Sequence, residues 1–277
     1  MSFYLNYDGK IVRADEPVVQ ATNRGFRYGD GLFETMRMTN SVIPLLTLHF
    51  ERLFQGIALL GFELPGYLTP LYLENKIQEL CQINSNSDSA RVRLMVFRGN
   101  GTLYDPEDNT PHYIIETASL PTVGDGGNTD CIMGIYRSAR KAADHFSAIK
   151  SNNYLPYLMG ALHARTMGWT DSIILNTTGN VCESCISNIF IIKDGIIITP
   201  SLSEGCVAGV MRRHLLEVLP GWHFQVHEAA VTTEMLKEAD EVFLSNAVNG
   251  IRYVLQVEDI YYDKTITSRI YNAITNS

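Results

Sequence analysis

Several stretches of residues 1–119 alternate apolar and polar positions, which indicates β-strands. Asp8-Gly9 is a dipeptide typical of tight hairpin turns, and it lies between two such runs. A long segment, residues 99–111, is rich in Gly, Pro, Asp and Asn and is therefore expected to be a loop. The pattern predicts strands on both sides of Asp8-Gly9, over residues 32–38, from Arg91, and over residues 113–118.

Apolar residues spaced three and four apart predict two helices in the same region. The first runs from Thr47, which can cap its start, to Gly61, which can close its end. Arg52 lies off the apolar stripe of this helix, beside His49. It is either an ordinary solvated arginine or an anion clamp, because a guanidinium donates in a planar fork that matches phosphate oxygens. The expected buried stripe is Phe50, Leu53, Phe54, Ile57 and Leu60, and the second helix covers residues 71–83.

The composition changes over SLPTVGDGGNTD, which begins at Ser119. This segment holds three glycines, one proline and few large apolar residues, as domain boundaries commonly do. The expected division is a small N-terminal α+β domain over residues 1–119, an interdomain loop over residues 120–130, and a larger C-terminal domain over residues 131–277.

Beyond this boundary, a predicted strand leads toward Lys150 and a helix follows. Asn152 or Asn153 can cap the helix, Pro156 fits its first turn, and Gly168 can end it. The expected buried stripe of this helix is Leu155, Leu158, Met159 and Leu162.

Short strands and turns alternate through the rest of the chain. Asp194-Gly195 marks a second hairpin, and a loop that contains glycine leads into a helix from about Gly209. A helix start offers N–H groups and the positive end of the helix dipole, so this one is a natural phosphate site. The expected strands cover residues 172–175, the residues that follow Val181, and residues 241–254 on both sides of a turn.

The composition limits the class of protein. The 277 residues are 45% apolar and 19% charged, which is typical of a soluble globular protein with enough apolar sequence for two domains. A formal net charge of −8 argues against a general nucleic-acid or acidic-membrane binder. We expect a cytoplasmic protein, because no apolar run approaches the roughly 18 residues that span a bilayer and the first residues do not resemble a signal peptide.

The cysteines do not indicate a disulfide framework. Their number, five, is odd, so reduced thiols are expected. Cys182 and Cys185 form a single CxxC without a second Cys or His pair, which is a weak signal for zinc or redox activity. We expect no metal site and leave the role of the two thiols open.

Four separated motifs occur in order along the chain: YGDGLFE, HFERL, IKSNNYL, and CESCISNIF followed by AGVMRR. No single motif is decisive, but the ordered set spans nearly the whole chain. It resembles class IV of the pyridoxal-phosphate enzymes, which comprises branched-chain and D-amino acid aminotransferases and aminodeoxychorismate lyase. The resemblance implies an α+β, two-domain fold of the D-amino acid aminotransferase type, with a β-barrel-like core in the larger domain. It also implies pyridoxal 5'-phosphate as cofactor, and a homodimer in which N-terminal segments reach the partner's pocket.

The resemblance implies roles for individual residues. Lys150 matches the lysine that forms a Schiff base with the cofactor aldehyde and then moves the substrate proton. Glu183 matches the glutamate that pairs with the pyridine nitrogen, so that the ring acts as an electron sink. Tyr154 lies near the position of a tyrosine that, in branched-chain members, hydrogen-bonds the ring oxygen of the cofactor, although the local spacing is one residue shorter in this chain. The phosphate would be held by Arg52, the N–H groups of Val210 and Met211, and Asn246, and the substrate pocket would be lined by Tyr28, Phe33 and Arg37.

Two loops leave the substrate open. D-amino acid aminotransferases carry an arginine and a histidine in the loop equivalent to residues 99–105, which is GNGTLYD here, so their carboxylate trap is missing. Residues 245–250 are SNAVNG, with Ala247 where branched-chain members usually have a threonine that touches phosphate. This turn is closer to that of the lyases, but the lyases' arginine-bearing loop has no match either.

Three functions follow, in order of preference. The first is an aminotransferase that moves an amino group between an L-amino acid, for example a branched-chain or glutamate-like one, and a 2-oxo acid. The second is an aminodeoxychorismate lyase that releases pyruvate and 4-aminobenzoate. The third is an inactive fold that serves as a binding module, which is disfavoured because Lys150, Glu183 and Arg52 are all present.

Overall fold

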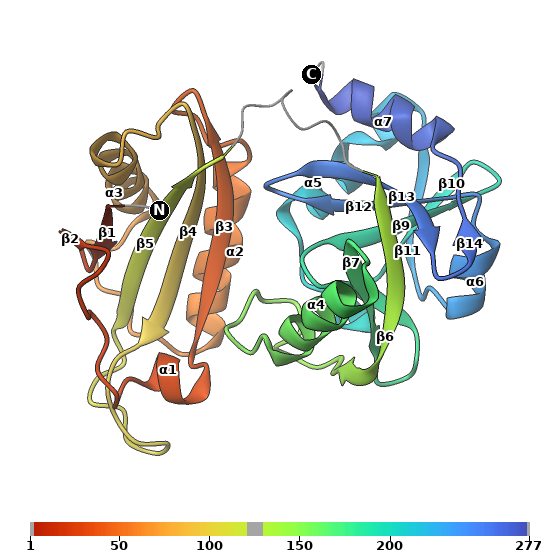
Figure 1. Ribbon diagram of the computed structural model, residues 1–277. Helices are drawn as coiled ribbons and strands as arrows, with labels where there is room; N and C mark the ends of the chain where they lie inside the picture. The colour runs from red at the N-terminus through yellow and green to blue at the C-terminus, as the bar shows by residue number, and fades with distance from the viewer. Residues whose placement is uncertain (1–2, 121–129, 276–277) are drawn as a thin grey trace. The chain divides into compact units, whose positions relative to one another are not determined.

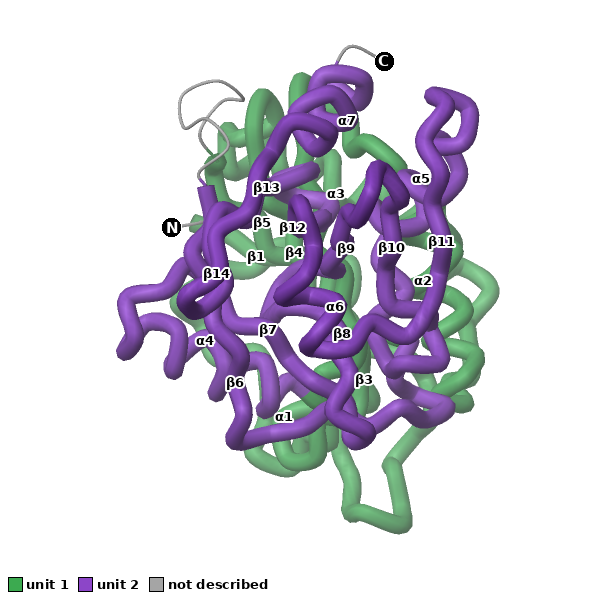
Figure 2. Tube along the Cα trace, turned by 90° about the vertical axis from the view of Figure 1, so that its right-hand side faces the viewer, with its two compact units in different colours: residues 1–125, 149–153 green, residues 126–148, 154–277 purple. Residues whose placement is uncertain are grey.

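The computed structural model describes residues 3–120 and 130–275, which form two compact units. The first unit comprises residues 1–125 and 149–153, and the second comprises residues 126–148 and 154–277 (Figure 2). Residues 149–153, which the sequence had placed in the C-terminal domain, therefore belong to the first unit. Of the predicted interdomain loop, residues 121–129 lie outside the described part of the chain.

The first unit is a five-stranded antiparallel sheet with helices on one face (Figure 1). The strand order is β2-β1-β5-β4-β3, so β3 lies at one edge. The strands predicted from alternation, the hairpin at Asp8-Gly9 and both predicted helices are confirmed. The strands are β1 (Tyr4–Tyr7), β2 (Lys10–Arg13), β3 (Gly31–Thr39), β4 (Ser89–Arg98) and β5 (Pro111–Ser119), and the helices are α1 (Arg24–Tyr28), α2 (Leu46–Leu59) and α3 (Pro70–Ile83).

Alternation along β3 divides its side chains between the two faces of the sheet. Leu32, Met36 and Met38 are buried in the core with α2 and α3. Phe50, Leu53 and Ile57 of α2 are fully buried as predicted, with Phe54 and Leu60 partly buried beside them. The predicted cap by Thr47 is wrong, because α2 begins one residue earlier after Leu45, whose φ of 58° is left-handed, and no side chain caps it.

A short segment from the middle of the chain covers the free edge of β3. The N–H of Phe33 donates to the carbonyl of Lys150 at 2.9 Å, and the N–H of Asn152 donates to the carbonyl of Gly31 at 2.9 Å. Leu32 and Ser151 form an antiparallel bridge between these bonds. This pairing explains why residues 149–153 belong to the first unit although their flanking elements belong to the second.

The second unit is built on a nine-stranded mixed sheet. The order is β11-β10-β9-β12-β13-β6-β7-β8, with β14 paired to β13. The hairpin at Asp194-Gly195 and the strand predicted over residues 172–175 are confirmed. The strands are β6 (Cys131–Lys141), β7 (Asp171–Asn176), β8 (Val181–Ser184), β9 (Asn188–Lys193), β10 (Ile196–Pro200), β11 (Gln225–Ala229), β12 (Glu241–Asn246), β13 (Gly250–Val257) and β14 (Ile260–Tyr261). The helices are α4 (Leu155–Met167), α5 (Val210–Val218), α6 (Thr233–Glu238) and α7 (Thr265–Thr275), with short 3-10 turns η1 (Leu202–Glu204) and η2 (Pro220–Trp222).

Helix α4 buries a different face from the predicted one. Its buried residues are Tyr157, Gly160 and Ala164. A Cβ at Gly160 would lie 2.9 Å from both Cys185 Sγ and Ile174 Cδ1, so the helix lies close to the sheet through its small residues. The predicted stripe is exposed instead, and no side chain caps the helix, so the proposed cap by Asn152 or Asn153 is also wrong. The exposed stripe consists of Leu155, Leu158, Met159 and Leu162.

Replacing Gly31 with alanine tests the junction at β3. A Cβ there would lie 2.3 Å from the Val96 carbonyl oxygen and 2.7 Å from Asn152 Nδ2, so the neighbouring segments must separate. Overpacking of this kind costs about 1–3 kcal/mol. We expect Gly31→Ala to unfold at a lower urea concentration than the wild type. Gly66→Ala is the matched control, since a Cβ there meets nothing within 4 Å, and equal losses in the two variants would contradict the role of close approach.

Candidate active site

Lys150 is held by its backbone at the edge of β3. Its ammonium nitrogen lies 4.7 Å from the centroid of the Phe33 ring, and the guanidinium carbon of Arg93 lies 4.1 Å from the same ring. Phe33 is 3% exposed, so its ring is a fixed surface beneath both cations. The predicted catalytic lysine and one predicted substrate residue are therefore neighbours in the first unit.

Arg52 belongs to a buried ionic cluster between α2 and β3. Its Nε donates to Glu34 Oε1 at 2.8 Å and its Nη2 to Glu34 Oε2 at 2.5 Å, a two-point contact that fixes the plane of the guanidinium. His49 Nδ1 lies 2.6 Å from Glu34 Oε2. Burial alone would raise the pKa of Glu34, but the charge of Arg52 and the hydrogen bonds from His49 and Arg52 outweigh it and lower the pKa from 4.5 to about 2.

Close packing links the helix of Arg52 to the lysine segment. A Cβ at Gly56, one turn after Arg52, would lie 3.2 Å from Leu32 Cδ2 and 3.7 Å from Ile149 Cγ2. The small residue lets α2 approach both β3 and the residue before Lys150. Arg52 and Lys150 are therefore supported by one packed unit.

The remaining predicted substrate residues also lie in the first unit. Tyr28 ends α1 and is 38% exposed, with the guanidinium groups of Arg24 and Arg27 each 5.6 Å from its ring centroid. Arg37 shares a face of β3 with Phe33 and lies opposite Arg91 in the β3–β4 register.

Sequence reasoning missed Arg93. The signal was present in the run RVRLMVF, because alternation places Arg91 and Arg93 on the face opposite the buried Val92 and Leu94. What the sequence could not show is that this face also carries Phe33, which pairs with Met95 two residues further along β4.

Glu183 is a buried acid of the second unit and lies within strand β8. Its Oε1 accepts hydrogen bonds from Lys141 Nζ at 2.7 Å and from the Tyr157 hydroxyl at 2.6 Å. Its Oε2 accepts from the backbone N–H of Val207 at 3.1 Å. Burial raises the pKa of Tyr157, with a further increase from the charge of Glu183, so the phenol is a neutral donor.

Helix α5 starts at Val210, three residues beyond Val207. Gly209 is the N-cap and no side chain caps the helix, so the first N–H groups, including those of Val210 and Met211, are those that a helix leaves without intrahelical partners. Asn188 Nδ2 donates to the carbonyl of Val207 at 2.9 Å. A Cβ at Gly209 would lie 1.8 Å from Asn188 Oδ1, so only glycine fits this cradle.

Two further predicted residues of the second unit make contacts within the protein. The Tyr154 hydroxyl donates to the carbonyl of Cys185 at 2.8 Å. Asn246 closes the turn after β12, since its Oδ1 accepts from the N–H groups of Val248 and Asn249, and its Nδ2 donates to Ser187 Oγ at 2.9 Å. The roles of Tyr154 and Asn246 toward a cofactor remain predictions.

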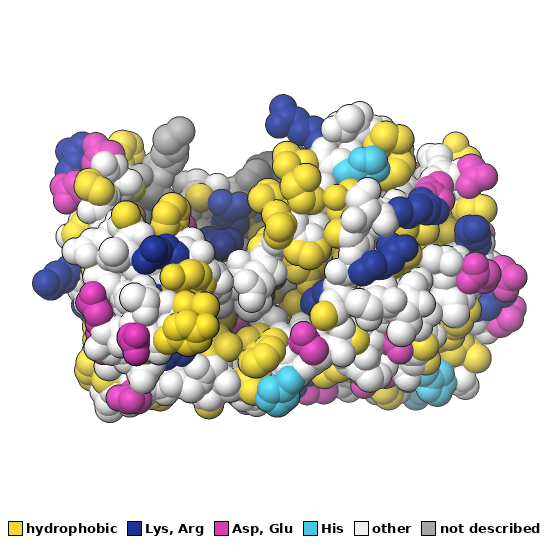
Figure 3. Space-filling model, turned by 90° about the horizontal axis from the view of Figure 1, so that it is seen from below, with side chains coloured by type: hydrophobic (Ala, Val, Ile, Leu, Met, Phe, Trp, Pro, Cys, Tyr) yellow, Lys and Arg dark blue, Asp and Glu magenta, His cyan; other side chains and the backbone are white. Residues whose placement is uncertain are grey.

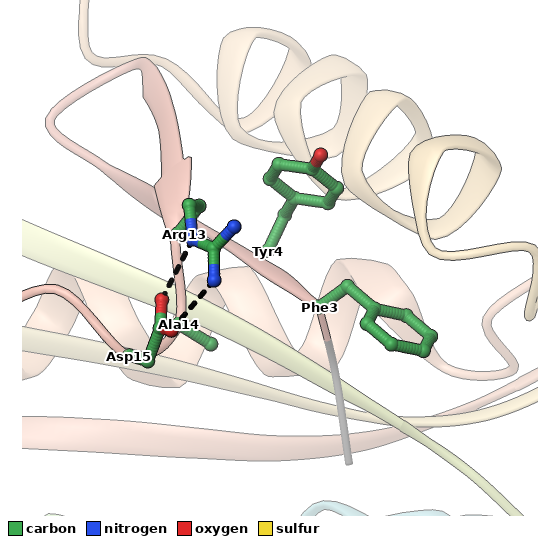
Figure 4. Close-up of a pocket in the computed structure, with 5 residues that line it drawn as sticks. All are labelled: Phe3, Tyr4, Arg13, Ala14 and Asp15. Carbon is green, nitrogen blue, oxygen red and sulfur yellow. Dashed lines mark hydrogen bonds and ion pairs between the residues drawn. The ribbon is translucent and has the colours of Figure 1, made fainter.

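The described residues also include a surface pocket and five buried thiols. A pocket on the β1–β2 hairpin is lined by Phe3, Tyr4, Arg13, Ala14 and Asp15, where Arg13 pairs with Asp15 in solvent at 2.7 Å (Figure 4). Residues 3–120 and 130–275 contain no cluster of three or more His, Cys, Asp or Glu suited to a metal.

The five cysteines are buried and free, and burial raises the pKa of the thiols of Cys182 and Cys185. No helix in these ranges is both long and apolar enough to cross a membrane.

These residues fit pyridoxal 5'-phosphate by the chemistry of their donors. The first unit offers an amine at Lys150 and a clamped guanidinium at Arg52. The second offers a buried carboxylate at Glu183 and an uncapped helix start with a glycine cradle at Gly209. An aldehyde, a phosphate and a ring nitrogen are the groups that such donors bind.

Comparisons with known proteins give the family. The family model for amino-transferase class IV matches residues 31–257, so the chain belongs to this family, and the resemblance seen in the sequence is confirmed. A protein of Methanocaldococcus jannaschii, provisionally named a branched-chain-amino-acid aminotransferase, is 29% identical over 93% of this chain and 88% of its own length. Aminodeoxychorismate lyase of Vibrio harveyi is 27% identical over 83% of each chain. The crystal structure of Escherichia coli branched-chain amino acid aminotransferase, 24% identical, has the same fold, with a TM-score of 0.89 over all of this chain and 94% of that one.

Acid unfolding should report the cluster around Glu34. Because its pKa is lowered in the native state, Glu34 contributes stability above about pH 4.5, and this contribution is lost as the pH falls toward 2. The shift corresponds to roughly 3 kcal/mol. We expect Glu34→Gln to be less stable than the wild type at neutral pH and to lose less stability on acidification, as measured by urea denaturation at each pH. Glu116→Gln, at an exposed position, should keep the wild-type acid dependence; an unchanged dependence in Glu34→Gln would contradict the assignment.

Proposed function

We propose that this class IV enzyme is an aminotransferase that uses pyridoxal 5'-phosphate to move an amino group between an amino acid, with branched-chain amino acids as the first candidates, and a 2-oxo acid. The observation that carries the proposal is the placement of Lys150, which backbone hydrogen bonds fix on β3 beside Phe33. Several relatives are named branched-chain aminotransferases, which supports the choice of substrate.

In this proposal each residue has a separate role toward the cofactor or the substrate. When bound, the cofactor supplies an aldehyde and an electron-withdrawing ring. Arg52 and the N–H groups of Val210 and Met211 bind the phosphate, and Glu183 holds a proton on the ring nitrogen. Lys150 would remove the proton from the substrate Cα and return it at the carbon that was the cofactor's aldehyde carbon, which a primary amine can do once its charge is disfavoured by a nearby cation. Phe33 and Arg37 orient the substrate.

The role of Lys150 is tested by colour and by turnover. Protein purified with the cofactor should be yellow, and borohydride should abolish the visible absorption band by fixing the cofactor to Lys150. Lys150→Ala should lose the band and lose activity by about 10²–10⁴-fold or more. Lys193→Ala, at an exposed lysine paired with Asp240, should keep both. A colourless wild-type protein that takes up no cofactor would contradict the proposal.

Aminodeoxychorismate lyase is the second candidate function. It is favoured by the Vibrio harveyi relative and by Asn246, which shapes the SNAVNG turn. A half-reaction assay separates the two functions. In an aminotransferase, an amino acid alone should convert the bound cofactor to its amine form. In a lyase, aminodeoxychorismate should release pyruvate without any 2-oxo acid, and amino acids should leave the spectrum unchanged.

We also propose that the protein is a homodimer and that α4 contributes to its interface. Leu155 and Leu158 are 67% and 54% exposed, with Met159 and Leu162 beside them, and such apolar patches commonly mark interaction sites. Figure 3 shows exposed hydrophobic side chains among polar ones on the face seen from below. A cytoplasmic location remains a prediction from the sequence.

Leu158→Glu tests this interface. A charge at the centre of the α4 stripe should shift the protein from dimer toward monomer, because a carboxylate would have to be desolvated on association. Light scattering after size-exclusion chromatography measures the mass. Leu71→Glu on α3 is the matched control, since Leu71 is 65% exposed outside the stripe. An unchanged mass in Leu158→Glu, or an equal shift in both variants, would contradict the proposal.

A further inference from the structure

Glu183, which is proposed to contact the cofactor, already pairs with a cation of the protein, Lys141. The proposed contact does not explain this pairing. Lys141, the last residue of β6, donates from Nζ to Glu183 Oε1 at 2.7 Å and to the Ser147 carbonyl at 3.1 Å. The side chains of Lys141 and Glu183 are only 12% and 5% exposed. This is a buried ion pair, in which the removal of one partner leaves an uncompensated charge.

The donors are divided unequally between the two carboxylate oxygens of Glu183. Oε1 accepts from Lys141 and Tyr157, and also from the N–H of Val207 at 3.2 Å. Within the described part of the chain, Oε2 accepts from this N–H alone, at 3.1 Å. A carboxylate oxygen has about two acceptor sites. Oε2 therefore retains the capacity to accept a further N–H, whereas Oε1 is fixed by the protein.

The charges explain why a lysine is useful at this position. A buried carboxylate needs a positive partner or it becomes costly. A protonated cofactor ring would supply that charge only while it is bound. Lys141 supplies it at all times, and Tyr157, which is neutral, adds a hydrogen bond to the same oxygen without adding charge.

We propose that Lys141 is a built-in counter-ion, which compensates the charge of Glu183 and holds its carboxylate in position in the cofactor-free protein. The inference rests on the proposed role of Glu183 toward the ring nitrogen. Lys141 is a positioning residue, because it acts on the cofactor only through Glu183. Its main effect is on the protein before the cofactor binds, when no other cation of the described residues contacts this carboxylate.

Melting temperatures of the cofactor-free and loaded protein test this role. Lys141→Met keeps the side-chain length and removes the charge. The cofactor-free variant should melt several degrees below the cofactor-free wild type, and the loaded variant should lose less, since the bound ring then compensates Glu183. The rise in Tm caused by pyridoxal 5'-phosphate should therefore be larger in Lys141→Met. An equal rise would show a merely structural role, and a smaller rise would show that Lys141 contacts the cofactor itself; either overturns the inference.

Matched variants separate charge from packing. Lys141→Arg should restore the wild-type rise, and Tyr157→Phe, which removes a hydrogen bond but no charge, should leave the rise unchanged. Lys193→Met removes a lysine from an exposed pair and should also leave it unchanged. A rise in Tyr157→Phe as large as in Lys141→Met would overturn the inference, since hydrogen bonding rather than charge would then be the cause.

Two further outcomes need separate treatment: a Lys141→Met variant that does not fold, and a wild type that the cofactor does not stabilise. If Lys141→Met does not fold without cofactor, Lys141→Gln, which is neutral but keeps an N–H donor, is measured in the same way and should show the larger rise. If the cofactor fails to stabilise the wild type, the cofactor assignment itself is wrong, and the inference falls with it. A stabilised wild type with the wild-type rise in Lys141→Gln overturns the inference alone.

Discussion

Two backbone hydrogen bonds between residues 150–152 and the edge of β3 determine which of the candidate catalytic residues belong to the same unit. An edge strand exposes N–H and C=O groups that need partners, and this segment supplies them. Lys150 thereby joins the unit that holds Phe33 and Arg52, although β6 and α4 on either side belong to the other unit. Backbone pairing fixes the position of Cα more firmly than side-chain contacts do, so the amine is presented from a defined place.

Two buried carboxylates, Glu34 and Glu183, are paired with basic side chains of their own unit. Glu34 is paired with Arg52 and His49 in the first unit, and Glu183 with Lys141 in the second. Removing either cation would strand a buried carboxylate, which is far more costly than losing a surface pair. Each of these two carboxylates therefore has a basic partner within its own unit.

Local rules predicted most of the elements because alternation and turn chemistry act over a few residues. The hairpins at Asp8-Gly9 and Asp194-Gly195 and the α2 stripe are of this kind. Apart from the two helix caps, the failures are non-local. Nothing near Lys150 shows that its backbone pairs with β3, and Lys141 is an ordinary basic residue until β8 places Glu183 against it. In α4 the large apolar residues were expected inside, but close packing through Gly160 and Ala164 left them exposed.

Charge alone cannot choose between the two candidate functions. Arg37 lies opposite Arg91 in the register of β3 and β4, so two cationic side chains occupy one face of the sheet. Amino acids, 2-oxo acids and aminodeoxychorismate all carry carboxylates, so a cationic face attracts every one of them. Discrimination must then come from shape and from polar groups that only one substrate satisfies, since a missing hydrogen-bond partner costs far more selectivity than a missing methylene. Substrate choice is therefore expected to depend on the polar groups around the reacting carbon more than on the arginines that draw the substrate in.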